Sequence, residues 1–212
     1  MTSNLAAGSS TVATTASEPV TASGFQSRKK LDGAGIIAGR IVACLLAPFV
    51  ILVAALFVPF ILVSSNEFPI WRQKRAGYRG RDIFVPKFST MNADASGKLH
   101  ETWFGRLVRP VGLDEILQIL LIANGDMQWF GPRPFIRSHV NDEYIRAVLF
   151  LTKPGFINSR SLATGIGNRA LQGGAISIPE LIRYDRDDLS RWSFTYAVGL
   201  LFRTVLAVMK IR

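Results

Sequence analysis

The sequence predicts a mostly α-helical chain with a few short strands, held at a membrane by an inserted N-terminal helix. Residues 41–63 form a run of 23 positions without a charged side chain. Later segments repeat apolar residues at the spacing of one helix face. The formal net charge is +10, from 25 Lys and Arg against 15 Asp and Glu, which favours anionic partners such as lipid head groups or phosphorylated substrates.

Composition divides the chain into three regions. Residues 1–27 are rich in Ser, Thr, Ala and Gly and are expected to form a disordered tail. The apolar run begins too late for a secretory signal. Residues 28–67 are expected to be the membrane-inserted segment, and residues 68–212 a mostly helical cytoplasmic domain that lies against the membrane. The single cysteine, Cys44, lies in the apolar run, so an internal disulfide is not possible.

The apolar run has two possible topologies. At about 1.5 Å per residue, a helix of this length suffices to cross a hydrocarbon core of about 30 Å. However, Pro48 and Pro59 lie inside it, and each removes a backbone donor and bends a helix. Basic residues also flank the run on both sides, whereas a spanning helix favours them on one side. These features favour a broken, re-entrant helix that enters and leaves by one face, with a single span as the alternative.

The first part of the domain is expected to combine a strand with two helices. Residues 68–77 mix Trp71 with charges, as is typical of a membrane interface. A short strand interrupted by Pro86 is expected over 83–88, and a polar loop over 92–97.

Two helices follow, over 102–108 and from about Leu113 to the stop signal at 124–126. The second helix has one apolar face, formed by Leu113, Ile116, Leu117, Leu120 and Leu121.

The C-terminal part is expected to alternate turns and helices. Residues 131–134 form a rigid Gly-Pro turn, and a helix is expected over 142–149. The Gly-rich stretch 164–174 is expected to be a loop, and a helix with Pro in its first turn is expected over 179–188. Residues 194–211 fit an amphipathic interfacial helix better than a span, because an arginine lies near the middle.

Two adjacent carboxylates, Asp114 and Glu115, stand at the start of the second predicted helix, just after Gly112. The helix dipole and the free N–H groups of a first turn stabilise negative charge, which predicts a lowered pKa for Asp114. One interpretation is an ordinary helix start. The other is a reaction centre in which ionised Asp114 attacks phosphorus and both acids bind a metal. Mg²⁺ is the expected ion, since it takes a few carboxylates together with substrate phosphates.

Three cations, Lys87, Arg109 and Arg133, stand before and after these acids across predicted turns. The planar fork of arginine suits bidentate contact with phosphate, which predicts a phosphate site. The alternative is a solvated basic surface. The basic residues do not form a stripe interleaved with aromatic residues, so nucleic-acid binding is not expected.

Six segments, taken jointly, form a specific pattern: Lys87-Phe88-Ser89-Thr90-Met91, Leu113-Asp114-Glu115-Ile116-Leu117-Gln118, Gly125-Asp126-Met127, Gly131-Pro132-Arg133-Pro134, Lys153-Pro154-Gly155, and Asp185 with Trp192-Ser193-Phe194 behind it. This pattern resembles the bacterial sugar transferase family, the small monotopic phosphoglycosyl transferases, over roughly residues 40–210.

The resemblance implies an enzyme that moves a sugar-1-phosphate from a UDP-sugar to a polyprenyl phosphate, typically undecaprenyl phosphate, and releases UMP. It implies Asp114 as the nucleophile, Glu115 as support for Mg²⁺, and four substrate-binding residues: Lys87, Arg109, Arg133 and Asp185. It further implies a re-entrant helix broken at a proline, contact with membrane lipids, and a catalytic domain on the cytoplasmic face of the bacterial inner membrane. The product would begin an exopolysaccharide or another surface glycoconjugate, and a homodimer is possible.

The sequence also departs from this family. Ser89 and Lys153 stand where the family usually has a basic residue and an arginine. Residues 156–169 lack the expected Trp, and Arg160 or Arg169 is expected to supply the missing cation to the substrate. These departures leave a second hypothesis open, a catalytically degenerate membrane-bound scaffold in the same kind of pathway. The intact Asp-Glu pair favours an active enzyme.

Overall fold

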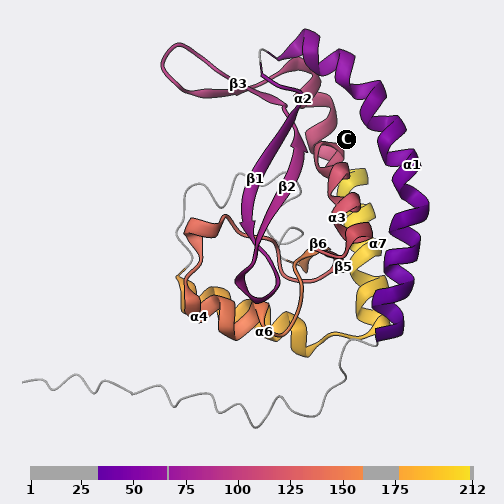
Figure 1. Cartoon of the computed structure of the whole chain (residues 1–212), viewed down its shortest axis with the longest axis vertical. Coiled ribbons are helices and arrows are strands. Elements are labelled where there is room, and N and C mark those ends of the chain that lie inside the picture. Colours follow the sequence, from indigo (N-terminus) through magenta and orange to yellow (C-terminus); the bar gives the residue numbers. More distant parts are fainter. Residues whose placement is uncertain (1–32, 66, 160–176, 211–212) are drawn as a thin grey trace, which may run out of the picture. The chain divides into compact units, whose positions relative to one another are not determined.

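A computed structural model describes residues 33–65, 67–159 and 177–210, all of which belong to one compact unit, Leu31–Arg212 (Figure 1). The described part is mostly helical with three two-stranded sheets, which confirms the predicted fold class at this level. The predicted tail, 1–27, and loop, 164–174, lie outside the described residues.

The elements include short helical turns, labelled η. In chain order they are α1 (Gly33–Ser64), β1 (Ile70–Ala76), η2 (Tyr78–Gly80), β2 (Asp82–Phe88), β3 (Met91–Ala93), β4 (Leu99–Glu101), α2 (Trp103–Val108), η3 (Arg109–Val111), η4 (Leu113–Gln118), α3 (Ile119–Asn124), β5 (Gln128–Phe130), η5 (Arg137–His139), α4 (Asp142–Tyr144), the π-helical turn η6 (Ile145–Leu149), β6 (Gly155–Ile157), α6 (Ile178–Ser190) and α7 (Phe194–Lys210).

Helix α1 contains the apolar run and is long and apolar enough to cross a membrane, by length and composition. It continues through Pro48 and Pro59 as one bent helix of 32 residues, and its predicted re-entrant topology stays a prediction (Figure 1). Each proline removes only one backbone donor, and the rest of the ladder persists on either side. Most of its large apolar side chains are exposed, among them Ile41, Leu45, Phe49, Leu52, Leu56 and Val63.

Both ends of α1 contact the same compact body. Near the first end, Trp129 Nε1 donates to Gly39 O at 2.8 Å, and Arg40 Nη2 donates to the two carbonyls that end α3, at 3.3 and 3.4 Å. At the other end, Ser65 Oγ donates to Asn92 Oδ1 at 2.9 Å. Between them α1 runs along α3 (Figure 1). The helix is therefore attached along its length rather than by one end.

Aromatic side chains join α1 to the strands and helices that follow it. Phe57 of α1 packs against Phe88 of β2 and Phe104 of α2, with ring centroids 5.5 and 5.1 Å apart. Phe60 stacks on Phe104 at 5.8 Å and meets Trp103 edge-on. The inner face of α1 thus forms part of the hydrophobic core.

The strands differ from expectation in four places. Strand β1 pairs with β2 as an antiparallel hairpin over 70–76, where the sequence predicted only an interfacial segment. Pro86 does not interrupt β2, because a two-stranded sheet leaves room for a residue without a backbone donor. The predicted loop 92–97 begins in β3, which pairs with β4. The parallel pair β5 and β6 was not predicted.

Most predicted helices are confirmed, with the end signals that the sequence carries. Thr102 Oγ1 accepts from Gly105 N at 2.9 Å and begins α2. Pro179 lies in the first turn of α6, and Glu180 accepts from Ser177 N at 3.2 Å there. Helix α7 follows and leaves several apolar side chains exposed: Val198, Leu201, Phe202, Val205 and Met209.

Candidate active site

The two carboxylates lie where the predicted helix begins. Gly112 follows η3 and ends it. Its φ of 71° is a left-handed backbone conformation, which glycine adopts more readily than other residues. The predicted helix 113–124 exists, but its first half, η4, is a 3₁₀-helix and only its second half, α3, is α-helical. Asp114 and Glu115 occupy the first turn of η4, which packs against β2.

Asp114 is buried, with 7% of its surface exposed. Burial, followed by the negative charge of Glu115, raises its pKa, while Lys87 and Arg109 act in the opposite direction. The predicted lowering of this pKa is therefore wrong. A carboxylate that loses its water shell is disfavoured in its ionised form, and here that effect exceeds the benefit of the helix start.

Glu115 is held by cations and an amide. Lys87 Nζ of β2 forms an ion pair with its Oε1, Arg133 Nη2 lies 3.5 Å from the same oxygen, and Gln118 Nε2 donates to Oε2 at 3.0 Å. Burial alone would raise the pKa of Glu115. The charges of Lys87 and Arg133, with the hydrogen bonds, lower it to about 2. Glu115 is therefore an anion at neutral pH.

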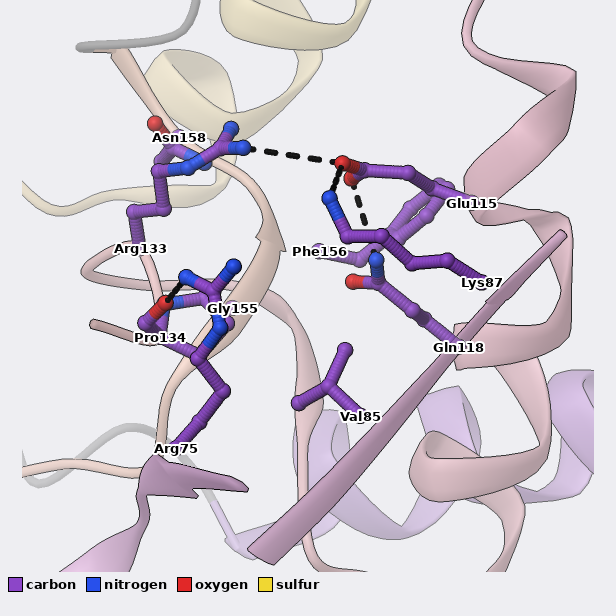
Figure 2. Close-up of a pocket in the computed structure, with 10 residues that line it drawn as sticks. All are labelled: Arg75, Val85, Lys87, Glu115, Gln118, Arg133, Pro134, Gly155, Phe156 and Asn158. Carbon is purple, nitrogen blue, oxygen red and sulfur yellow. Dashed lines mark hydrogen bonds and ion pairs between the residues drawn. The ribbon is translucent and has the colours of Figure 1, made fainter. Parts of the chain in front are cut away.

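A pocket opens between these residues (Figure 2). In the figure, Glu115, Lys87 and Gln118 lie on one side, and the guanidinium groups of Arg133 and Arg75 lie on the other. Its lining comes from β1, β2, η4, the turn after β5, and β6: Arg75, Val85, Lys87, Glu115, Gln118, Arg133, Pro134, Gly155, Phe156 and Asn158.

The predicted site residues thus lie in three places. Lys87, Glu115 and Arg133 meet in the pocket. Arg109 does not line the pocket. Its Nη1 donates to Thr90 Oγ1 at 3.2 Å, and its Nε lies 3.4 Å from Glu101 Oε1. Its positive charge acts to lower the pKa of buried Asp114.

Asp185 is not among the residues that line the pocket. It is buried on α6 and accepts a hydrogen bond from the Tyr144 hydroxyl at 2.6 Å. Its substrate-binding role stays a prediction, and Arg160 and Arg169 lie outside the described residues.

Gln118 and Arg75 are among the lining residues that sequence reasoning did not assign to the site. Gln118 stands three positions after Glu115 on the same helix, a spacing that brings side chains together and could have identified it. Arg75 was missed because β1 was not predicted. Its Nη1 donates to Pro134 O at 2.6 Å, and burial, followed by the charge of Arg133, lowers its pKa to about 10.

The side chains present offer Mg²⁺ only part of a coordination sphere. The described residues contain no cluster of three or more His, Cys, Asp or Glu side chains that could hold a metal. Asp114 and Glu115 are adjacent, but Oε1 of Glu115 faces Lys87 and Arg133. Mg²⁺ at this place would need phosphate oxygens from a ligand to complete its coordination, as this ion commonly does.

The arrangement suits the transfer of a phosphoryl group. A buried carboxylate with a raised pKa is a better nucleophile, once ionised, than an ordinary aspartate. The adjacent lysine and arginines can stabilise negative charge on phosphate oxygens.

Comparison with known proteins gives a consistent result. The sequence profile of the family described as bacterial sugar transferase matches residues 33–211. A UDP-glucose:undecaprenyl-phosphate glucose-1-phosphate transferase of Caulobacter vibrioides is 28% identical over 82% of this chain and 67% of its own. Exopolysaccharide production protein ExoY of Rhizobium meliloti is 25% identical, with 82% of each chain covered.

A UDP-galactose-lipid carrier transferase of Erwinia amylovora is 25% identical over 80% of this chain. The chain spans only 38% of that relative's length. The profile match covers most of the chain and includes the Asp-Glu pair and every residue that lines the pocket. The chain therefore belongs to the bacterial sugar transferase family.

Proposed function

We propose that this chain is a phosphoglycosyl transferase. It moves a sugar-1-phosphate from a UDP-sugar to undecaprenyl phosphate and releases UMP, as the first step of a surface polysaccharide or glycoconjugate pathway. The observation that carries the proposal is Asp114, buried beside a pocket in which Lys87 and Arg133 face Glu115. Relatives are named for transfer of sugar phosphates to the same lipid carrier.

The reaction has two steps. An oxygen of ionised Asp114 attacks the phosphorus that bears the sugar, the bond from that phosphorus to UMP breaks, and an acyl phosphate forms. A phosphate oxygen of undecaprenyl phosphate then attacks the same phosphorus and releases Asp114. Lys87 and Arg133 stabilise the charge that develops on the phosphate oxygens. Asp114 and Glu115 would hold Mg²⁺ together with the diphosphate, and the ion would neutralise charge on the leaving UMP.

The proposal includes a re-entrant arrangement of α1 at the inner membrane, with the catalytic domain on the cytoplasmic face. Its support is that Gly39 and Ser65, near opposite ends of α1, both bond to the compact body. A helix whose ends lie on opposite sides of a bilayer cannot keep both contacts. Exposed apolar side chains on α2, η3, η4 and α7 support an interfacial position for the domain: Trp103, Leu107, Val111, Leu113 and Phe202.

The experiment uses the full chain in detergent or nanodiscs, with Mg²⁺, undecaprenyl phosphate and a panel of UDP-sugars. We expect release of UMP from at least one sugar nucleotide. Without the lipid acceptor, intact-mass analysis should find a phospho-sugar adduct on Asp114. Asp114→Asn should form no adduct. Retained turnover in that variant would contradict the mechanism, and thermal stabilisation by none of the nucleotides would favour a catalytically inactive scaffold.

A further inference from the structure

Arg75 lies in the pocket with part of its hydrogen-bonding capacity unused. It reaches the pocket from β1, where the backbone of Ala76 also bonds to Phe135 O at 2.9 Å. Nη1 donates to Pro134 O at 2.6 Å, and Nη2 donates to Gln73 Oε1. Nε is buried and has no partner among the residues that the structure describes. A buried donor without an acceptor costs free energy, so this nitrogen is suited to a ligand atom.

The charges around Arg75 specify the kind of ligand. The pocket lining contains three cationic side chains, Arg75, Lys87 and Arg133, and one carboxylate, Glu115. Glu115 is already paired with Lys87 and lies 3.5 Å from Arg133, whereas Arg75 has neutral oxygens as its bonded partners. Burial and, after it, the positive charge of Arg133 lower the pKa of Arg75. An anion bound between the two guanidinium groups would counteract the effect of Arg133.

We propose that Arg75 is a further substrate-binding residue, whose guanidinium group, together with that of Arg133, binds a phosphate oxyanion. Figure 2 shows the two guanidinium groups on one side of the pocket, opposite Glu115 and Lys87, so that a phosphate between the two sides meets cations from both. A guanidinium edge matches two oxygens of one phosphate. The inference rests on the proposed function, which supplies phosphate from two sources, the sugar nucleotide and the lipid acceptor.

Arg75 also has a structural role that the experiment must separate from binding. Its bond to Pro134 O holds the turn that carries Arg133. If it acted only in this way, its loss would displace Arg133, and affinity would fall in step with thermal stability. If it binds phosphate directly, replacement by lysine keeps a positive charge but removes the planar fork, so affinity falls more than stability does.

The experiment measures binding by calorimetry with the full chain in detergent. The probes are inorganic pyrophosphate, UDP and a short-chain polyprenyl phosphate. The variants are Arg75→Gln and Arg75→Lys. Arg72→Gln is the matched control, because Arg72 lies on the same strand with an exposed side chain outside the pocket lining. We expect Arg75→Gln to weaken pyrophosphate binding about tenfold or more, Arg75→Lys to be intermediate, and the control to stay within about twofold of the parent chain.

The outcomes separate the possibilities. A loss of affinity for UDP as well as pyrophosphate assigns the site to the sugar nucleotide, and a loss for the polyprenyl phosphate instead assigns it to the acceptor. Unchanged pyrophosphate affinity in Arg75→Gln, or affinity that follows the melting temperature across both variants, would overturn the proposal. Because pyrophosphate binding needs neither uridine, sugar nor turnover, this result stands apart from whether the chain uses any UDP-sugar.

Discussion

Asp114 and Glu115 are neighbours in the chain, yet their pKa values are displaced in opposite directions. Burial and the charge of Glu115 raise that of Asp114, whereas Lys87 and Arg133 lower that of Glu115 to about 2. The sequence assigned both acids to one environment, the first turn of a helix. Their cationic partners come from β2, from η3 and from the turn after β5, and the local sequence around the acids does not show which of these cations each acid meets.

The raised pKa of Asp114 predicts how the rate of adduct formation depends on pH. Only the ionised carboxylate attacks phosphorus, so the rate should fall with acidity at a pH above the ordinary aspartate value of 3.8 and level off at higher pH. This fall in rate can be measured as single-turnover adduct formation, monitored by intact-mass analysis in buffers from acidic to mildly alkaline pH. A rate constant that holds its plateau value down to pH 3.8 would contradict the raised pKa.

Neutralising the two acids should change stability in opposite directions. The raised pKa of Asp114 means that its ionised form destabilises the fold at neutral pH, so Asp114→Asn should raise stability by about 1 kcal/mol, or about 2–4 °C in Tm. The lowered pKa of Glu115 means that its charge stabilises the fold above its ordinary value of 4.5. This contribution is lost as the pH falls towards about 2.

Glu115→Gln should therefore cost about 1–3 kcal/mol at neutral pH, because Lys87 and Arg133 lose their counter-ion. Denaturant unfolding of the two variants and the parent chain, at neutral and at acidic pH, measures the sign of the change in unfolding free energy for each substitution. Equal destabilisation by both substitutions would contradict the opposite displacements.

At the scale of elements, the helices were predictable and the strands largely were not. The helices carry periodic apolar residues and end signals such as Thr102 and Pro179. Strand β1 carries three charged residues among seven and pairs as a hairpin with β2, so its sequence shows no apolar strand pattern. β5 and β6 have three residues each, too few for a period to appear. The unpredicted strands carry three of the ten lining residues: Arg75, Gly155 and Phe156.

The β5–β6 pair provides a test at this scale. A Cβ added to Gly155 would lie 2.0 Å from Gly131 N and 2.5 Å from Phe130 C, both backbone atoms that cannot move aside cheaply. Gly155→Ala should therefore separate the strands and displace the turn that carries Arg133. The expected cost is about 2–4 kcal/mol of stability, with loss of transferase activity.

The matched control is Gly199→Ala in α7, where a Cβ meets nothing within 4 Å. This substitution should instead stabilise the chain by about 0.5–1 kcal/mol, since alanine favours a helix more than glycine does. Thermal unfolding of both variants and the parent chain measures the change in stability that each substitution causes. A Gly155 variant as stable as the control would show that the close strand approach does not matter.

At the scale of the whole molecule, the contacts at the two ends of α1 are the observation that supports the proposed re-entrant arrangement. The bonds of Gly39 with Trp129 and of Ser65 with Asn92 both require these ends to reach the same body. The symmetric basic flanks of the apolar run predicted the same arrangement from sequence, and it stays a prediction. The prolines alone predicted a bend and did not show that the helix continues through both of them.

Labelling with a membrane-impermeant maleimide in intact cells tests the topology. In a Cys44→Ser background, single cysteines replace Gly33 or Glu67, exposed positions at either end of α1. Both should stay unlabelled from outside and react after the membrane is opened, because a re-entrant helix leaves both ends on the cytoplasmic face. Labelling of either cysteine from outside would establish a spanning helix instead.

The aromatic packing of Phe57 and Phe60 against Phe88 and Phe104 has a consequence for making a water-soluble form of this enzyme. Truncation before β1 would remove half of that cluster and leave the catalytic domain with an open core. Surface redesign is the workable route: keep the inward residues of α1 and replace the outward ones, such as Leu45, Leu52 and Leu56, with polar helix formers. The aromatic cluster therefore joins α1 to the rest of the compact unit, and the exposed side of α1 is the one open to substitution.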